Sequence, residues 1–266
     1  MDFINAIILG IVEGLTEFLP ISSTGHLIIV NQWIAFDENF TKVFDIVIQF
    51  GAILAVVLYF WDRLYPFSKK KNKMEKKNII SIWYKTLLGV IPALIIGGLW
   101  GSKIEELLFK PEVVALSLFV GGIILIAIEK RKTYSEINNI NSLSYSKAFI
   151  IGIIQCLAMI PGTSRSAATI VGAMLLGTSR LVAVEFSFFL AVPTIFAATC
   201  HSLLKSSIPF QAHELLLLAT GLLVSFLVAW GVISSLMAYI SRHNFKPFGY
   251  YRIILGFLVL LLFSLK

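Results

Sequence analysis

The chain has 266 residues, of which 58% are hydrophobic and 14% are charged, and its mean hydropathy is +0.87. These values exclude an ordinary soluble domain and indicate a single integral membrane domain over residues 1–266. The net charge of +7 resides largely in short loops, with no basic face of the kind that nucleic acid requires. We therefore expect contact with membrane lipids and no nucleic acid.

The first broken apolar segment, residues 1–35, contains two acids. Glu13 and Glu17 are four residues apart, so a helix places both carboxylates on one face, where they repel each other. Pro20 disfavours helical geometry at Leu19, so the helix is expected to end there. Two carboxylates at membrane depth are costly, and they indicate a polar site.

A hydroxyl-rich turn of Ser22, Ser23 and Thr24 follows, and Gly25 and His26 then open a second apolar run. A hydroxyl turn between two helical arms, with acids on one arm and an imidazole on the other, predicts a functional site. The alternative is structural. A single histidine on an apolar arm is typical of a satisfied core residue, and hydroxyls in membrane helices often bond only the helix backbone.

Six later apolar stretches have about the length that crosses a bilayer as a helix, namely 44–61, 86–100, 113–128, 181–204, 214–236 and 251–265. Basic residues mark three loops, namely Lys69, Lys70, Lys71, Lys73, Lys76 and Lys77, then Lys130, Arg131 and Lys132, and finally Arg242 and Lys246. If segments 1–35 and 147–176 each enter and leave by one face, all three loops share one side. The positive-inside rule then predicts six transmembrane helices plus two re-entrant helix-loop-helix hairpins, with these loops cytoplasmic. The opposite side keeps Lys42, Lys103, Lys110, Lys205 and Lys266.

The second broken segment resembles the first. The aligned pairs are Gly10-Ile-Val-Glu13 with Gly152-Ile-Ile-Gln155, Leu19-Pro20 with Ile160-Pro161 and, after a one-residue slip, Ser22-Ser23-Thr24 with Thr163-Ser164-Arg165. Internal repeats over 1–132 and 143–266 would each hold one hairpin and three spans, and an odd number of spans makes the topology inverted. The two turns would then meet near the midplane. Chance similarity between two apolar, glycine-containing stretches is the alternative.

The second turn carries an arginine in apolar sequence. Gly162 permits an unusual backbone angle, and Ser164 and Ser166 can cap the half-helix that follows. The guanidinium of Arg165 suits a phosphate or a carboxylate, and a half-helix N-terminus offers amide groups to an anion. The predicted phosphate-binding residues are Ser22, Thr24, Gly162, Thr163, Ser164, Arg165 and Ser166. Arg165 could instead neutralise one of the two acids as a structural ion pair.

These side chains suit phosphoryl chemistry. Ser23, or a neighbouring hydroxyl, could attack phosphorus with His26 as general base and later as general acid. Arg165 and the helix ends would stabilise the charge on the transferred oxygens. Glu13 and Glu17 could hold a divalent cation, Mg²⁺ or Ca²⁺, through oxygen ligands. The spacing leaves a serine, a histidine and a metal-activated water open as nucleophiles.

Two long motifs resemble the signatures of one family. Residues Glu13-Gly-Leu-Thr-Glu-Phe-Leu-Pro-Ile-Ser-Ser-Thr-Gly-His26 and Pro161-Gly-Thr-Ser-Arg-Ser166 are similar to the motifs of the bacterial undecaprenyl pyrophosphate phosphatases, the bacitracin-resistance type. Gln49 with Gly51, and Pro247-Phe-Gly-Tyr-Tyr-Arg252, resemble secondary segments of that family. The resemblance runs through essentially the whole chain.

The resemblance implies a bacterial inner-membrane enzyme that removes the terminal phosphate of undecaprenyl pyrophosphate and so recycles the lipid carrier of peptidoglycan and other envelope polymers. It implies bacitracin resistance, a divalent cation and a pocket open to the periplasmic or outer face. The family's roles fall on Glu13 and Glu17 for metal binding or acid–base work, Ser23 as nucleophile, His26 as its acid–base partner and Arg165 as phosphate clamp.

Two other families share part of this pattern. A secondary transporter or flippase for an anionic lipid also uses paired broken helices in an inverted repeat, but it needs no nucleophile. The type-2 phosphatidic acid phosphatases require a histidine six residues after the arginine, where this chain has Val171. The pattern formed by Gly10 and Gly14 serves either internal helix packing or a homodimer.

Overall fold

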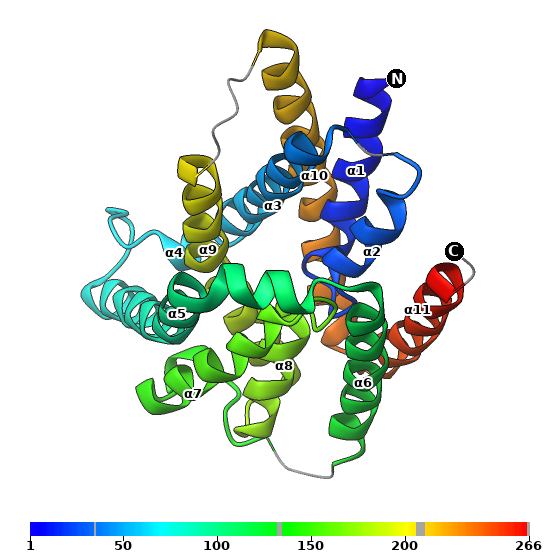
Figure 1. The fold of residues 1–266 in the computed structure, drawn as a ribbon. Helices are drawn as coiled ribbons and strands as arrows, with labels where there is room; N and C mark the ends of the chain where they lie inside the picture. The colour runs from blue at the N-terminus through cyan, green and yellow to red at the C-terminus, as the bar shows by residue number, and fades with distance from the viewer. Residues whose placement is uncertain (35, 132–134, 206–210, 265–266) are drawn as a thin grey trace.

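The computed structural model describes residues 1–34, 36–131, 135–205 and 211–264, and in these ranges the chain is built from helices and the loops between them (Figure 1). Lys132 and Lys266 lie outside the described residues. The helices are α1 (Asp2–Thr16), α2 (Ser23–Val30), α3 (Glu38–Tyr59), α4 (Trp61–Leu64), α5 (Lys73–Leu108), α6 (Pro111–Lys130), η1 (Ile140–Ser142), α7 (Tyr145–Gln155), η2 (Cys156–Met159), α8 (Arg165–Leu175), α9 (Arg180–Lys205), α10 (Ala212–Ile240) and α11 (Lys246–Ser264).

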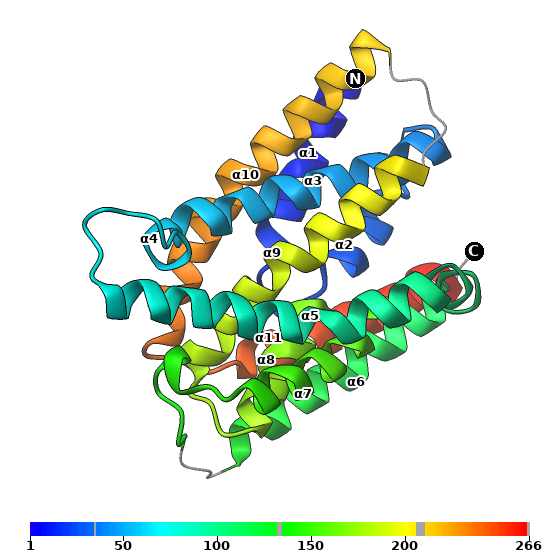
Figure 2. The same ribbon diagram turned by 90° about the vertical axis from the view of Figure 1, so that its left-hand side faces the viewer.

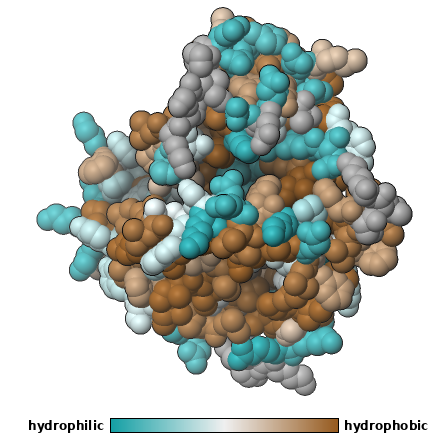
Figure 3. Space-filling view, in the orientation of Figure 1, coloured by the Kyte–Doolittle hydropathy of each residue, from teal (hydrophilic) through white to brown (hydrophobic). Residues whose placement is uncertain are grey.

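Six helices are long and apolar enough to cross a membrane, namely α3, α5, α6, α9, α10 and α11, as predicted. Large hydrophobic side chains on them face outward, for example Leu99 (68% exposed) and Phe257 (63% exposed). Figure 3 shows such side chains covering much of the lower half of that view. An outward apolar surface of this extent fits contact with lipid.

Helix α5 is much longer than the stretch 86–100 that hydropathy marks. It begins at Lys73 because Asn72 and Glu75 form a capping box, in which each side chain accepts the other residue's amide N–H. Pro92 lies inside the helix without ending it.

The two broken segments form helical hairpins whose turns lie in the middle of the molecule (Figure 2). Helix α1 ends at Thr16, three residues before the predicted end at Leu19. The reason is that Pro20 has no N–H to donate to the Thr16 carbonyl, so residues 17–20 form turns instead. The two turns touch, since the Ser166 hydroxyl donates to the Leu19 carbonyl at 2.8 Å.

The hairpins pack on opposite halves of the chain. Helix α1 packs against α10, and α7 packs against α5. This exchange is what an inverted repeat predicts, whereas the boundaries 1–132 and 143–266 stay a prediction. A Cβ on Gly10 would lie 2.7 Å from the Gly221 carbonyl, and one on Gly14 would lie 2.7 Å from that of Ser225. The glycine pattern of α1 therefore serves packing inside the chain.

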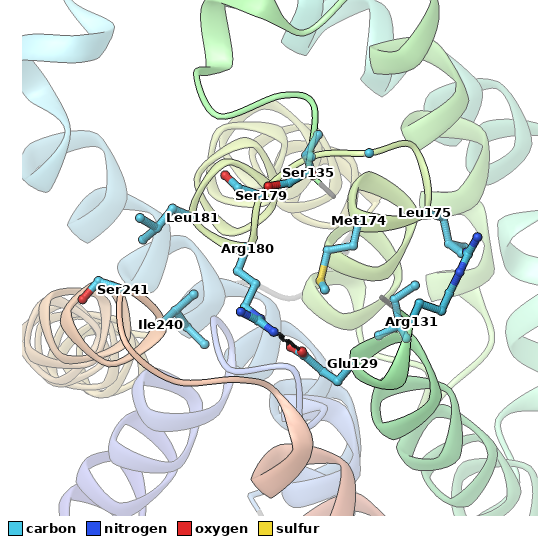
Figure 4. A pocket seen from close by; sticks show the side chains of 13 residues that line it. Glu129, Arg131, Ser135, Met174, Leu175, Ser179, Arg180, Leu181, Ile240 and Ser241 are labelled. Carbon is cyan, nitrogen blue, oxygen red and sulfur yellow. Dashed lines mark hydrogen bonds and ion pairs between the residues drawn. The ribbon is translucent and has the colours of Figure 1, made fainter. Parts of the chain in front are cut away.

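The basic loops gather at one end of the molecule, here called the basic end, which holds residues 69–77, 130–131 and 242–246 (Figure 2). The buried carboxylate of Glu129 on α6 accepts from Arg180 at 2.5 Å and from the amide of Phe245 at 2.9 Å. Figure 4 shows Arg180 reaching Glu129 at a cavity of about 270 Å³. Glu129 thus ties the basic-end termini of three helices together, as the six-span topology requires.

Cysteine labelling tests this topology on a single helix. In a background lacking Cys156 and Cys200, cysteines at Lys73 and at Lys103 should react with a membrane-impermeant maleimide from opposite faces, because these residues lie near opposite ends of α5. Labelling of both positions from the same face would contradict the six-span arrangement.

Candidate active site

The two turns start their half-helices in the same way. Ser22 and Ser164 are the non-glycine residues with positive φ in the described chain, at 74° and 71°. Each caps its helix by accepting from the amide three residues on, at 3.3 and 3.2 Å. Ser22 is therefore the counterpart of Ser164, and the predicted slip that pairs it with Thr163 is wrong. In this alignment Ser23 is the counterpart of Arg165. The first turn therefore has a hydroxyl at the position where the second turn has a guanidinium.

Glu17 joins the two turns. Its Oε2 accepts from the Ser23 hydroxyl at 2.6 Å, and its Oε1 accepts from Arg165 Nη2 at 3.0 Å. Arg165 Nη1 donates to the Ser187 carbonyl at 2.8 Å, and its guanidinium lies 5.8 Å from the centre of the Phe18 ring. The buried Nε of Arg165 has no partner in the described protein. The arrangement holds a hydroxyl, a carboxylate and a guanidinium within one cluster.

A cavity of about 170 Å³ lies at this cluster. Its lining consists of Glu17, Ser22, Ser23, Thr24, Gln49, Ala158, Gly162, Ser164, Arg165 and Ile195. The structure thus brings together most of the predicted phosphate-binding residues, and it adds Gln49 from α3. Thr163 and Ser166 do not line the cavity. They hold the second turn, Thr163 through its carbonyl and Ser166 through its hydroxyl.

Glu13 lies beside Glu17, fully buried, and neither of its carboxylate oxygens has a hydrogen-bond donor in the described protein. A buried carboxylate without a donor needs a proton or a cation. The described residues contain no group of three or more metal-ligating acids, histidines or cysteines. Mg²⁺ is commonly held by one or two carboxylates together with substrate phosphate oxygens, so Glu13 and Glu17 fit a cation site that the substrate completes.

His26 lies elsewhere than predicted. Its Nδ1–H donates to the Ser22 carbonyl at 2.7 Å, and its Nε2 lies 2.7 Å from the Tyr251 hydroxyl. Its ring plane is nearly parallel to that of Tyr251, and the ring does not line the cavity. The expected pairing with Ser23 is not formed, because Ser23 donates to Glu17. The group placed to take the serine proton is therefore Glu17.

Sequence reasoning assigned no role to Arg252, which is fully buried. Its guanidinium donates to five backbone carbonyls, those of Pro20 (3.3 Å), Gly162 (3.0 Å), Thr163 (3.0 Å), Ser117 (3.0 Å) and Leu118 (3.4 Å). It therefore clamps both turns to each other and to α6. The available signal was a guanidinium at the start of an apolar span, since such a group needs partners.

Two grooves lead away from the cavity toward the end opposite the basic loops. The larger, about 1070 Å³, lies among the far ends of α3, α5 and α9, and the smaller, about 620 Å³, among those of α2, α3, α5 and α11. Thr24 lines both grooves and the cavity. A substrate can therefore approach from the end that lacks the basic loops.

The model of the bacitracin resistance protein BacA family matches residues 6–258, which include every residue of this cavity. The chain belongs to the BacA family. It is 49% identical to undecaprenyl-diphosphatase 1 of Clostridioides difficile (strain 630), over 100% of this chain and 97% of that protein. It is 46% identical to the undecaprenyl-diphosphatase of Enterococcus faecalis, over 98% of this chain and 97% of that protein. The undecaprenyl-diphosphatase of Caldanaerobacter subterraneus subsp. tengcongensis is 50% identical, over 99% of this chain and 97% of its own. The expected family is thus confirmed, and both BacA-type turns lie inside the match.

Proposed function

We propose that this chain is an undecaprenyl-diphosphatase, which removes the terminal phosphate of undecaprenyl diphosphate and returns the monophosphate carrier for envelope polymer synthesis. The observation that carries the proposal is the bonding of Glu17 to both Ser23 and Arg165, across two turns that each begin a half-helix. This arrangement offers a terminal phosphate a nucleophile on one side and a positive anion site on the other.

In the proposed first step, Ser23 Oγ attacks the terminal phosphorus while Glu17 takes the hydroxyl proton. The bond from phosphorus to the bridging oxygen breaks, and undecaprenyl phosphate leaves. Arg165 and the amides at the two helix starts bind the equatorial oxygens, on which charge is spread. Glu17 passes the serine proton to the departing phosphate oxygen and is again a carboxylate. In the second step Glu17 takes a proton from water, whose oxygen displaces Ser23 Oγ from phosphorus, and it returns that proton to Ser23, so inorganic phosphate and the free enzyme result.

Glu13 and Glu17 would hold the divalent cation, Mg²⁺ or Ca²⁺. When bound, such a cation neutralises the diphosphate and polarises its oxygens. The supporting observation is the donor-free carboxylate of Glu13 beside Glu17.

We place the enzyme in the bacterial inner membrane with its basic end in the cytoplasm, because short basic loops favour that side. The grooves then open to the outer face, where carrier diphosphate would enter. Bacitracin resistance would follow from consumption of this lipid diphosphate.

The test is phosphate release by the purified, detergent-solubilised protein from undecaprenyl diphosphate or farnesyl diphosphate. We expect release that a chelator abolishes and that added Mg²⁺ or Ca²⁺ restores. In Glu13→Gln, a higher concentration of cation should be needed to restore half of the activity, because one of the two carboxylates is lost. Full activity in chelator would remove the cation from the mechanism, and no release with metal present would refute the proposed function.

A further inference from the structure

His26 and Tyr251 form a bonded pair outside the catalytic cavity. The Ser22 carbonyl can only accept a hydrogen bond, so the 2.7 Å contact places the proton of the neutral imidazole on Nδ1. Nε2 is then an acceptor, and the Tyr251 hydroxyl donates to it at 2.7 Å. The two ring planes are nearly parallel, with centroids 5.6 Å apart and an angle of 4° between the planes. The Ser22 carbonyl thus sets the tautomer of His26, and the bond to Tyr251 helps to hold its rotamer.

The bond from His26 orients one peptide group. In a trans peptide the carbonyl and the following N–H point in opposite directions, and the described chain contains no cis peptide. Holding the Ser22 carbonyl along α2 therefore directs the Ser23 N–H out of the helix start. That N–H belongs to the first turn, whose amides lack partners within the helix, and Ser22 and Ser23 both line the cavity.

We propose that His26 and Tyr251 are positioning residues, which hold the peptide between Ser22 and Ser23 so that its N–H binds the phosphate that Ser23 attacks. This inference rests on the proposed phosphatase function. It assigns His26 a role through the backbone, and it leaves proton transfer to Glu17.

The second turn supplies an internal comparison. At the second turn the Ser164 carbonyl accepts the ordinary helical bond from Ala168 at 3.0 Å. At the first turn the matching bond, from the His26 amide to the Ser22 carbonyl, is stretched to 3.4 Å, and the imidazole also donates, at 2.7 Å. In the turn that carries Ser23, the side-chain bond is therefore made in addition to a lengthened backbone bond.

The experiment compares His26→Asn with His26→Ala. The asparagine amide nitrogen occupies the place of Nδ1 and can donate to the Ser22 carbonyl, but it cannot act as an acid or base near neutral pH. We expect kcat of His26→Asn within about 10-fold of wild type and kcat of His26→Ala lower by roughly 10²-fold or more, the usual effect of losing one oxyanion donor. The pH profile of His26→Asn should keep the wild-type shape.

Tyr251→Phe keeps the aromatic ring and removes only the hydroxyl. We expect kcat to fall several-fold, by no more than in His26→Asn, which loses the same bond, with KM little changed. Tyr250→Phe is the matched control, since this neighbouring side chain is 56% exposed, and its activity should equal that of wild type.

Two results would contradict the positioning role of His26 and Tyr251. A folded His26→Asn that is as inactive as His26→Ala, or an unimpaired Tyr251→Phe, would overturn the positioning role. If His26→Ala fails to fold, the comparison of His26→Asn and Tyr251→Phe with wild type still decides. An inactive wild-type protein would instead count against the proposed function itself.

Discussion

Replacing Ser23 with alanine should lower turnover by about 10³-fold or more, because the change removes the proposed nucleophile, the hydroxyl that is bonded to the proposed base Glu17. Binding of lipid diphosphate should persist, since Arg165 and the helix starts remain. The measurement is the initial rate of phosphate release together with equilibrium binding of the substrate.

Ser235→Ala is the matched control for this variant. The Ser235 hydroxyl only bonds the Gly231 carbonyl one turn earlier in α10, so its loss should leave the rate unchanged. Turnover of Ser23→Ala above a tenth of the wild-type rate would remove Ser23 as the nucleophile and favour a water or a histidine.

Arg165→Lys should lower kcat by roughly 10²-fold or more. A lysine can keep the charge pair with Glu17. A single ammonium cannot replace the planar guanidinium, which bonds Glu17 and the Ser187 carbonyl and has its Nε without a partner in the described protein, available to a phosphate oxygen. The measurement is kcat, with a thermal melt in detergent to show that the fold persists.

Arg180→Lys serves as the control, because Arg180 also pairs with a glutamate but lies at the basic end, away from the cavity. Its kcat should stay within about 3-fold of wild type, the range expected of a change that touches no reacting group. Near-normal activity of Arg165→Lys would make Arg165 a structural counter-ion of Glu17.

The fold was accessible from the sequence because its signals are local. Hydropathy marks six spans, and charge placement identifies segments 1–35 and 147–176 as hairpins without any knowledge of packing. The start of α5 was missed because the capping box at Asn72 extends the helix beyond the apolar stretch. The alignment of the two turns was wrong by one residue, because similar apolar residues at neighbouring positions do not define a register. The positive φ of Ser22 and Ser164 does define it.

The sequence predicted several of the residues that line the cavity, but it predicted few of their hydrogen bonds. Glu17, Ser23 and Arg165 were expected to be close, and they are. The partner of His26 could not be predicted, because Tyr251 is distant in sequence and only the packing of α11 brings it near. Spacing in a helix lets an imidazole reach back to the carbonyl four residues earlier, and here that local bond is formed in place of one to Ser23.

The most direct test of the central claim is phosphate release from undecaprenyl diphosphate with Mg²⁺ or Ca²⁺ present, for wild type beside Ser23→Ala. We expect wild type to yield one phosphate and one undecaprenyl monophosphate per substrate, and Ser23→Ala to yield almost none while it still binds the lipid. Folded wild-type protein that binds the lipid diphosphate but releases no phosphate would contradict catalysis at these turns, and it would point to transport of an anionic lipid instead.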